Sequence, residues 1–233
     1  MDGTHALTSA AWIRLYNTPY NYFQIELTLI SAIILAAGRS ERFGRDKRLE
    51  LIDNIPMLLA TALKLKNLVA DTLVVLGPDD HQHEKLLHDL GIATTRCPDA
   101  RLGMGHSLAH AVAQRGQSCG WLIMPADMPF VQTETVQRVL DAGQAHAIVA
   151  PVCQGRRGHP VWFERRFEQR LCALSGDEGA RSILREQGGQ ASSAELDQGG
   201  VFGQLYLIPV RDSGCLVDID SPKDLEQARS SLR

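Results

Sequence analysis

The feature that most constrains the fold of this chain is a regular alternation of apolar strands and amphipathic helices between residues 29 and 152. Runs such as LTLISAIILA (27–36) are apolar and β-branched without polar alternation, so they predict strands buried on both faces of a parallel sheet. Between these runs, apolar residues recur at helical spacing. The predicted strands cover 27–36, 71–77, 92–97, 120–127 and 146–152, and the predicted helices begin at Pro56 or cover 81–91, 105–116 and 133–143.

This alternation predicts an α/β fold built on a doubly wound, mostly parallel sheet. In such sheets a ligand binds beyond the carboxyl ends of the strands. After residue 150 the rhythm changes: GRRGHPVWF (155–163) predicts a turn or hairpin. Two short helices are then expected near 164–174 and 176–187, a loop over 188–200, strands at LYLIPV and CLVDID, and a last helix over SPKDLEQARSSL with Ser221 as its N-cap.

The overall composition excludes several classes of protein. The net charge of −3 over 233 residues gives no basic field for nucleic acid or an anionic membrane surface. No apolar run is long enough to span a bilayer, and the amino terminus lacks the pattern of a secretory signal. The five cysteines are scattered without a CxxC pair, which favours a reducing compartment, so we expect a cytoplasmic protein. Residues 1–28 show no clear period, and we interpret them as an extension outside a single domain at 29–233.

A glycine- and arginine-rich loop, LAAGRSERFGRDK (35–47), joins the first predicted strand to the first predicted helix. Gly38 and Gly44 permit positive φ and close approach of the backbone to a ligand, and successive amides in such a loop bind anions. The loop has neither GxxxxGK[ST] nor GxGxxG, so kinases, ATPases and dehydrogenases are not the first choices. A flexible basic surface loop is the alternative interpretation. The cations that favour phosphate binding are Arg39, Arg42, Arg45, Lys47 and Arg48.

Carboxylates follow two distant apolar segments. Asp127 ends the predicted strand GWLIMPAD, and Asp218 and Asp220 lie in LVDID. Mg²⁺ in phosphoryl-transfer sites is held by one or two carboxylates together with substrate oxygens, so these residues predict a magnesium site. The alternatives are a turn residue at Asp127 and a helix-start acid at Asp220.

Three histidines, His81, His83 and His88, lie within one predicted helix. Their spacing does not place three imidazoles on one face, so we expect a solvated surface rather than a metal cluster.

With these pieces in place, the chain resembles the MobA-like nucleotidyltransferases of molybdenum-cofactor biosynthesis, and within them the MocA-like cytidylyltransferases. The motifs that carry the resemblance run in the family's order over residues 29–228: LAAGRSERFGRDK, GMGHSL, PADMP, GRRGHPVWF, SGDEGARSIL and VDIDSPKDL. The resemblance implies a Rossmann-like fold of the nucleotide-diphospho-sugar transferase type, with a small hairpin and helical insertion on the acceptor side. Arg48 departs from the pattern, because an apolar residue more usually follows the lysine.

The resemblance also implies an activity: transfer of CMP from CTP to the phosphate of molybdenum-molybdopterin, with release of pyrophosphate. A client molybdoenzyme or its maturation chaperone is an implied partner. Ala37 stands where the guanylyl-transferring relatives have glycine, and this favours CTP over GTP. Three alternatives stay open: another nucleotide such as GTP, another phosphate acceptor, or a non-catalytic nucleotide-binding chaperone.

The resemblance assigns roles to individual residues. It implies that Lys47, Arg42 and Asp127 are catalytic, and that Asp127, with Asp218 or Asp220, holds Mg²⁺. Nucleotide-binding residues would be Leu35, Ala36, Ala37, Gly38, Arg39, Ser40, Gly44, Gly103, Met104 and Ser107. Acceptor-binding residues would be Gly155, Gly158, His159, Pro160, Asp177 and Arg181, although His159 could equally serve as a hydrogen-bonded turn residue.

Overall fold

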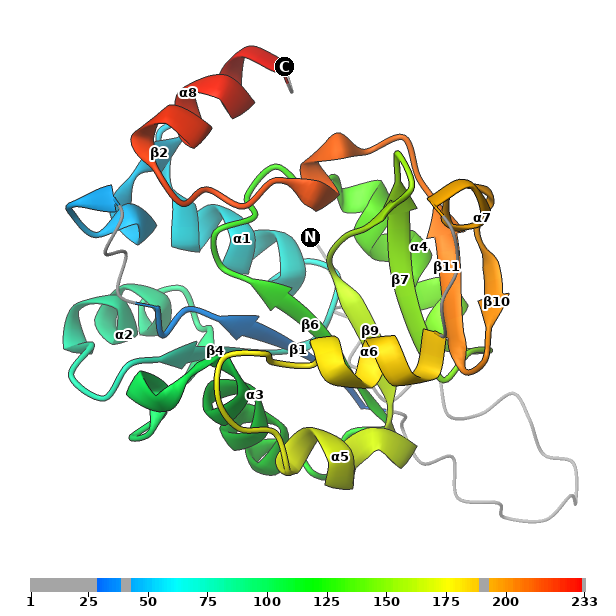
Figure 1. The fold of residues 1–233 in the computed structure, drawn as a ribbon. Helices are drawn as coiled ribbons and strands as arrows, with labels where there is room; N and C mark the ends of the chain where they lie inside the picture. The colour runs from blue at the N-terminus through cyan, green and yellow to red at the C-terminus, as the bar shows by residue number, and fades with distance from the viewer. Residues whose placement is uncertain (1–28, 39–42, 189–192, 232–233) are drawn as a thin grey trace, which may run out of the picture.

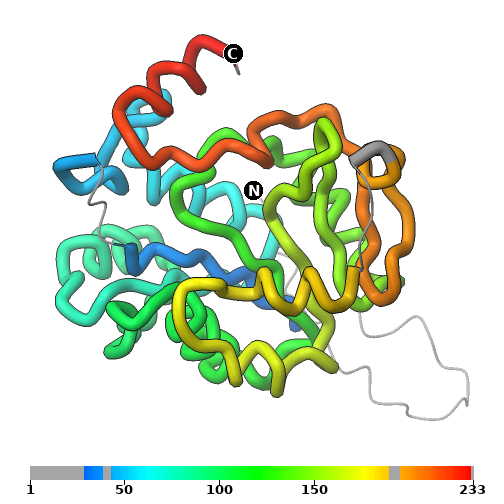
Figure 2. Tube along the Cα trace, in the orientation of Figure 1, coloured from blue at the N-terminus to red at the C-terminus, as the bar shows by residue number. Residues whose placement is uncertain are grey.

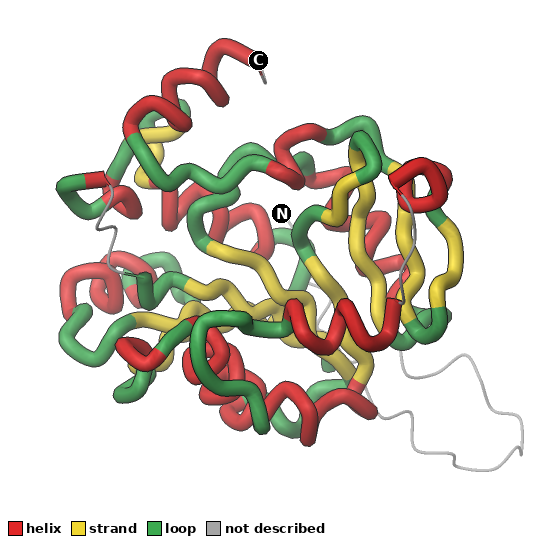
Figure 3. Tube along the Cα trace, in the orientation of Figure 1, coloured by secondary structure: helices red, strands yellow, loops and turns green. Residues whose placement is uncertain are grey.

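The computed structural model describes residues 29–38, 43–188 and 193–231. A nine-stranded sheet forms the middle of the molecule, with helices on both faces (Figures 1 and 3). Its strands are β1 (Ile30–Leu35), β4 (Asp71–Leu76), β5 (Ala93–Arg96), β6 (Gly120–Pro125), β7 (Ile148–Cys153), β8 (Arg156–Arg157), β9 (Val161–Glu164), β10 (Gly200–Phe202) and β11 (Leu205–Pro209). The predicted α/β fold with a mostly parallel central sheet is confirmed.

The strand order explains where a ligand can bind. Across the sheet the order is β10-β11-β7-β9-β6-β1-β4-β5, with β8 paired to β7. β1 pairs in parallel with both β4 and β6, and β4 pairs in parallel with β5. The chain winds outward from β1 in both directions, so a crevice opens at the carboxyl ends of β1, β4 and β6.

Helices cover both faces of the sheet because successive strand residues point to opposite sides. Ile34 belongs to a buried cluster with residues of the helices Met57–Lys66, His81–His88 and Thr133–Gly143 on one face. Ile33 belongs to a second buried cluster with residues of the helices Met104–Gln114, Glu168–Cys172 and Arg181–Gly188 on the other face. Both isoleucines are fully buried, and burying such a side chain stabilises the fold by about 1.5–3 kcal/mol. The helices are α1 (Met57–Lys66), α2 (His81–His88), α3 (Met104–Gln114), α4 (Thr133–Gly143), α5 (Glu168–Cys172), α6 (Arg181–Gly188), α7 (Ser193–Gln198) and α8 (Pro222–Ser231).

A smaller apolar cluster joins α8 to a short hairpin, β2 (Leu51–Ile52) and β3 (Ile55–Pro56). At the start of α8, the backbone amide of Ser221 donates to Asp224 Oδ2 over 2.7 Å, and the amide of Asp224 donates to Ser221 Oγ over 3.3 Å. The predicted capping box is therefore confirmed. Among the described residues, no helix is long and apolar enough to cross a membrane.

Three expectations after residue 150 need correction. The segment 155–163 does form a hairpin through β8, but β9 then continues inside the main sheet, antiparallel to β6 and β7. CLVDID is not a strand: a 3-10 helix covers Ser213–Leu216, and the chain then crosses the end of β6 (Figure 2). The expected loop 188–200 contains α7.

These differences have a long-range cause. Strand β9 pairs not only with the nearby β7 but also with β6, which lies beyond a whole helix in the sequence, and no local pattern reveals that pairing. The amide of Ile219 donates to the carbonyl of Asp127 over 2.9 Å instead of entering the sheet. Residues 1–28, which we interpreted as an extension, lie outside the described residues.

Candidate active site

A cleft of about 740 Å³ lies at the carboxyl ends of β1, β4 and β6. This is the position that the doubly wound topology predicts for a ligand. Many of the residues singled out in the sequence line this cleft, although they come from segments up to 185 positions apart. The lining residues that the sequence had predicted are Leu35, Ala36, Ala37, Gly38, Lys47, Gly103, Met104, Ser107, Asp127, Asp177 and Asp220.

Lys47 lies between two carboxylates at the mouth of this cleft. Its Nζ donates to Asp127 Oδ2 over 2.7 Å and to Asp220 Oδ1 over 2.8 Å. Lys47 belongs to a short 3-10 helix (Lys47–Leu49), Asp127 follows β6, and Asp220 precedes α8. The hydrogen bond from the amide of Ile219 to the carbonyl of Asp127 holds the two acidic segments side by side. Three distant parts of the chain therefore converge on one cation position.

The electrostatics of this group reflect its burial. Burial raises the pKa of Asp127 above its ordinary value, and repulsion from Asp218 and Asp220 acts in the same direction, while Lys47 opposes both. Burial alone would lower the pKa of Lys47, but the attraction of Asp127 and Asp220 outweighs it, so the net pKa of the ammonium is raised. The site favours a cation between its carboxylates.

The residues present fit a divalent metal ion. The second oxygen of Asp127, Oδ1, is buried and has no hydrogen-bond partner within the described residues. The ammonium of Lys47 occupies the position between Asp127 and Asp220 that a metal ion would take. Carboxylate oxygens are ligands that suit Mg²⁺ or Mn²⁺. Asp220 is the acid of this pair that binds Lys47, whereas Asp218 is exposed and acts on Asp127 through its charge. Over the described ranges, no three His, Cys, Asp or Glu side chains are already gathered as a metal-binding group.

Two glycine-containing loops meet at the opposite wall of the cleft. The amide of Gly105 donates to the carbonyl of Gly176 over 2.7 Å, and the amide of Gly176 lies 3.2 Å from His106 Nδ1. A Cβ on Gly103 would lie 2.3 Å from the backbone of Gly176, so only glycine fits there. The motifs GMGHSL and SGDEG, about 70 residues apart, thus form one wall that brings Asp177 into the cleft.

The other predicted nucleotide-binding residues lie partly elsewhere. Gly44 is exposed with a φ of 74°, and it does not line the cleft. Arg39, Ser40 and Arg42 lie outside the described residues, so their predicted roles stay predictions.

Most of the predicted acceptor-binding residues do not line the cleft. The amide of Gly155 donates to Asp197 Oδ1 over 2.9 Å at the tip of the β7–β8 hairpin. Gly158 packs against Cys215, where a Cβ would lie 2.4 Å from the carbonyl oxygen. Pro160 is buried, and Arg181 is exposed at the start of α6. Of the acceptor group, Asp177 alone lines the cleft, and the roles of the others stay predictions.

His159 lies on the segment that packs against residues 213–216. Its amide donates to the carbonyl of Cys215 over 2.9 Å, and its Nδ1 is buried without a partner among the described residues. Burial lowers the pKa of His159 to about 4, although a hydrogen bond with the backbone of Ile123 and the charge of Asp218 act in the opposite direction. The imidazole is therefore neutral at physiological pH.

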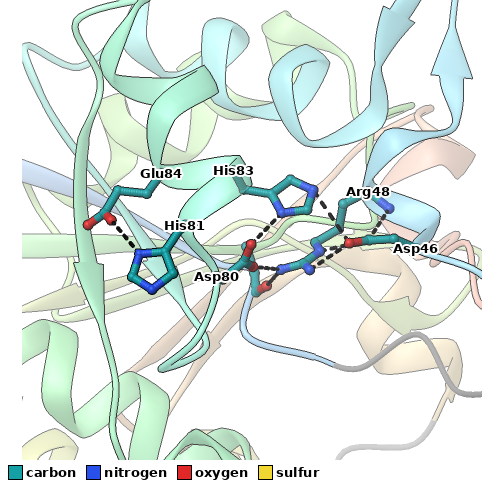
Figure 4. Close-up of polar contacts among 7 residues, drawn as sticks. Asp46, Arg48, Asp80, His81, His83 and Glu84 are labelled. Atoms are coloured by element: carbon teal, nitrogen blue, oxygen red, sulfur yellow. Dashed lines mark hydrogen bonds and ion pairs between the residues drawn. The ribbon is translucent and has the colours of Figure 1, made fainter.

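The sequence reasoning missed a polar cluster beside the cleft, formed by Asp46, Arg48, Asp80 and His83 (Figure 4). The expectation of a solvated surface holds for His81 and His88, whose side chains are exposed, but it is wrong for His83, which is only 2% exposed. His83 and Leu87 are four residues apart and both face the interior of the protein. That i, i+4 spacing with a leucine was the signal that could have placed His83 inside.

Comparison with known proteins agrees with this geometry. The sequence pattern of the MobA-like NTP transferase domain matches residues 32–192, which is more than half of the chain. The chain is 26% identical to the purine catabolism protein PucB of Bacillus subtilis, over 86% of this chain and 96% of PucB. It is 24% identical to a molybdenum cofactor guanylyltransferase of Cupriavidus metallidurans, over 88% of this chain and 96% of that protein.

Solved structures show the same architecture. The crystal structure of Rv0371c from Mycobacterium tuberculosis superposes with a TM-score of 0.71 at 25% identity, over 88% of this chain and 98% of Rv0371c. A crystal structure of that protein in complex with manganese gives a TM-score of 0.64 at 23% identity, over 88% of this chain and 100% of the other. The chain belongs to the MobA-like NTP transferase family, and it is a nucleotidyltransferase.

Proposed function

We propose that this enzyme transfers CMP from CTP to the phosphate of molybdenum-molybdopterin and releases pyrophosphate. The observation that carries the proposal is the convergence of Lys47, Asp127 and Asp220 at a cleft on the switch point of the sheet. A cationic loop facing paired carboxylates suits a substrate with a triphosphate and a divalent metal ion.

In the proposed reaction, a phosphate oxygen of the acceptor attacks the α-phosphorus of the nucleotide. A bond forms between that oxygen and the α-phosphorus. The bond from the α-phosphorus to the oxygen that bridges it to the β-phosphorus breaks, and that oxygen leaves with the electron pair as part of pyrophosphate. No general base is needed, because a phosphate monoester is already ionised near neutral pH. Positioning and charge neutralisation therefore supply most of the catalysis.

The residues of the cleft have separate tasks in this proposal. Asp127 and Asp220 would hold Mg²⁺, which supplies charge neutralisation at the α-phosphate when bound. Lys47 would turn from the carboxylates to the triphosphate and, with Arg42, offset charge on the leaving group. Gly38 and the wall containing Gly103 would line the nucleotide. The manganese in a related structure supports the use of a divalent metal ion.

The proposal also specifies the base of the nucleotide, with CTP favoured over GTP. Ala37 lines the cleft just after β1, and in the family that the chain resembles, alanine at this position in place of glycine goes with CTP. This supports CTP. The relatives named molybdenum cofactor guanylyltransferase favour GTP, which is the second candidate.

Pyrophosphate release measured with Mg²⁺ and molybdenum-loaded molybdopterin tests the proposal, with CTP, GTP, ATP and UTP supplied separately. Release with CTP alone is the expected result. Release with GTP instead would keep the reaction and overturn the assignment of the base. If no nucleotide gives release but CTP binds by isothermal titration, the acceptor assignment fails and a cofactor-binding chaperone takes its place. A client molybdoenzyme or its maturation chaperone would receive the product of the transfer or, if the protein is a chaperone, the bound cofactor.

A further inference from the structure

Arg48 fastens three separate segments of the chain to one another. Its Nη1 donates to the carbonyl of Ala36 over 2.7 Å, and its Nε and Nη2 donate to the two oxygens of Asp46 over 2.9 and 2.7 Å. Nη1 also forms an ion pair with Asp80. Figure 4 shows the guanidinium between the two carboxylates. The three acceptors lie at the end of β1, in the loop before Lys47, and at the start of α2.

The cluster is closed from the far side by His83. Its Nδ1 lies 2.5 Å from Asp80 Oδ1, and its Nε2 lies 3.5 Å from Asp46 Oδ2. The side chains of Arg48, Asp80 and His83 are only 15%, 12% and 3% exposed. The charges of Arg48 and Asp80 are paired and little exposed, so these side chains have few alternative arrangements and are held in one geometry.

The position of Ala36 makes this network an anchor for the catalytic loop. Ala36 is 3% exposed, and its amide donates to the carbonyl of Val75 over 2.9 Å, so its carbonyl is fixed to the central sheet. Asp46 and Arg48 are the two chain neighbours of Lys47. Arg48 is bound to Ala36 and Asp80, and Asp46 is bound to Arg48, so the backbone of Lys47 between them is held at one place opposite Asp127.

We propose that Arg48 is a positioning residue, which holds Lys47 at the reacting phosphates by tying its loop to Ala36 and Asp80, with Asp46 and His83 as support. The inference rests on the proposed nucleotidyl transfer. Arg48 lines the cleft, but Nε and Nη1 already donate to three protein acceptors, so it acts through Lys47 rather than as a principal phosphate ligand. Groups that orient a functional side chain in this way commonly contribute about 10–100-fold to activity.

The first test needs no turnover. In the substrate-free protein, the Nζ of Lys47 is bound to two carboxylates and its side chain is 12% exposed, so it should acetylate slowly. In the Arg48→Leu variant, Lys47 should be acetylated about tenfold faster than in the wild type, the lower end of the usual effect of removing an orienting group. Peptide mass spectrometry measures this rate. An unchanged rate of labelling in a folded Arg48→Leu protein would overturn the proposal, whatever the substrate is.

The matched control is Arg115→Leu. The Nε of Arg115 lies 2.9 Å from Asp71 Oδ2, in a partly buried ion pair at the opposite, amino end of β4. This variant loses a partly buried, ion-paired arginine like Arg48, but Arg115 follows α3 and binds at the end of β4 away from the cleft. It should lower the melting temperature but leave the labelling of Lys47 and kcat unchanged.

A double variant separates positioning from stability. Asp80→Asn combined with Arg48→Leu removes a buried charge that would otherwise lose its arginine partner and keep only His83, so part of the lost melting temperature should return. The double variant still lacks the hydrogen bond from residue 48 to the carbonyl of Ala36, so its Lys47 should still be acetylated faster than in the wild type. Its kcat should stay about 10–100-fold below the wild-type value, with a smaller effect on KM. Recovery of kcat together with the melting temperature would show that Arg48 is merely structural and would overturn the proposal. If the wild type releases no pyrophosphate, the labelling result still stands alone.

Discussion

Replacement of Gly103 by alanine should damage the cleft far more than the same replacement at a neighbouring glycine. Gly103 has a φ of 126°, and a Cβ there would lie 2.3 Å from the backbone carbon and oxygen of Gly176 and 2.6 Å from Asp177 Oδ1. The two closest atoms belong to the backbone, so no side-chain rotation relieves the clash. The 175–177 loop must move by about 1 Å, the difference between 2.3 Å and the 3.4 Å of ordinary contact.

The size of the effect follows from that displacement. A misplacement of about 1 Å in an active site can cost about 10²-fold in rate, and we expect a loss of that order in kcat/KM for Gly103→Ala. The strained backbone adds about 1–3 kcal/mol of destabilisation. Because about 1 kcal/mol shifts the melting temperature of a domain of this size by roughly 2–4 °C, the variant should also melt clearly lower.

Gly176→Ala is the control in the facing loop. Gly176 also has a positive φ, 66°, but a Cβ there would meet nothing within 4 Å. Gly176→Ala should lower the free energy of unfolding by about 1–2 kcal/mol, because alanine adopts a positive φ less readily than glycine, and it should keep most of its activity. Steady-state pyrophosphate release and thermal unfolding measure both quantities. If the kcat/KM of Gly103→Ala is within about threefold of that of Gly176→Ala, the loss is much smaller than the roughly 10²-fold expected from displacement of the 175–177 loop. That result would refute the inference that contact between Gly103 and Gly176 shapes the cleft.

Three further predictions concern the metal site and the base. Asp127→Asn should lower kcat by about 10²–10³-fold. Burial raises the pKa of Asp127 above 3.8, so the free energy of unfolding of the wild type should fall as the pH rises from 3.8 through the raised pKa. Asp127→Asn lacks this loss, so it should melt no lower than the wild type at pH 8. A lower melting temperature of the variant at pH 8 would contradict the direction of this pH dependence. EDTA should stop turnover and Mg²⁺ restore it, with unchanged circular dichroism, because Lys47 already bridges the carboxylates. Ala37→Gly should raise the ratio of GTP to CTP turnover about tenfold, and an unchanged ratio would remove Ala37 from base selection.

Much of the sheet and its helices could be predicted from the sequence because the relevant patterns are local. The predicted strand 71–77 corresponds to Asp71–Leu76, and the predicted helix 133–143 corresponds to Thr133–Gly143. A buried strand and an amphipathic helix each repeat their signal over a few residues. The order of such elements along the chain then restricts the topology, and with it the end of the sheet where a ligand can bind.

Elements whose partners are distant were predicted less well. The CLVDID segment has the composition of a strand, yet the amide of Ile219 bonds to Asp127, 92 residues earlier. His83 looks polar and exposed in the sequence, yet it is buried, with its Nδ1 against Asp80 and its Nε2 3.5 Å from Asp46. For Ile219, a hydrogen bond across the fold outweighs the local preference, and composition carries no record of the partner. For His83, the packing of its helix face decides, and Leu87 four residues later is the local signal of that burial.

The sequence by itself determined the fold class, the glycine-rich loop and the kinds of side chain that the site needs, because these depend on periodicity and residue type. Only the tertiary structure decided that Lys47 bridges Asp127 and Asp220, that Gly103 meets Gly176, and that Arg48 ties its loop to the sheet. The physical reason is that charge and hydrogen bonding act over a few ångströms in space, and the closing of the sheet sets which residues come that close.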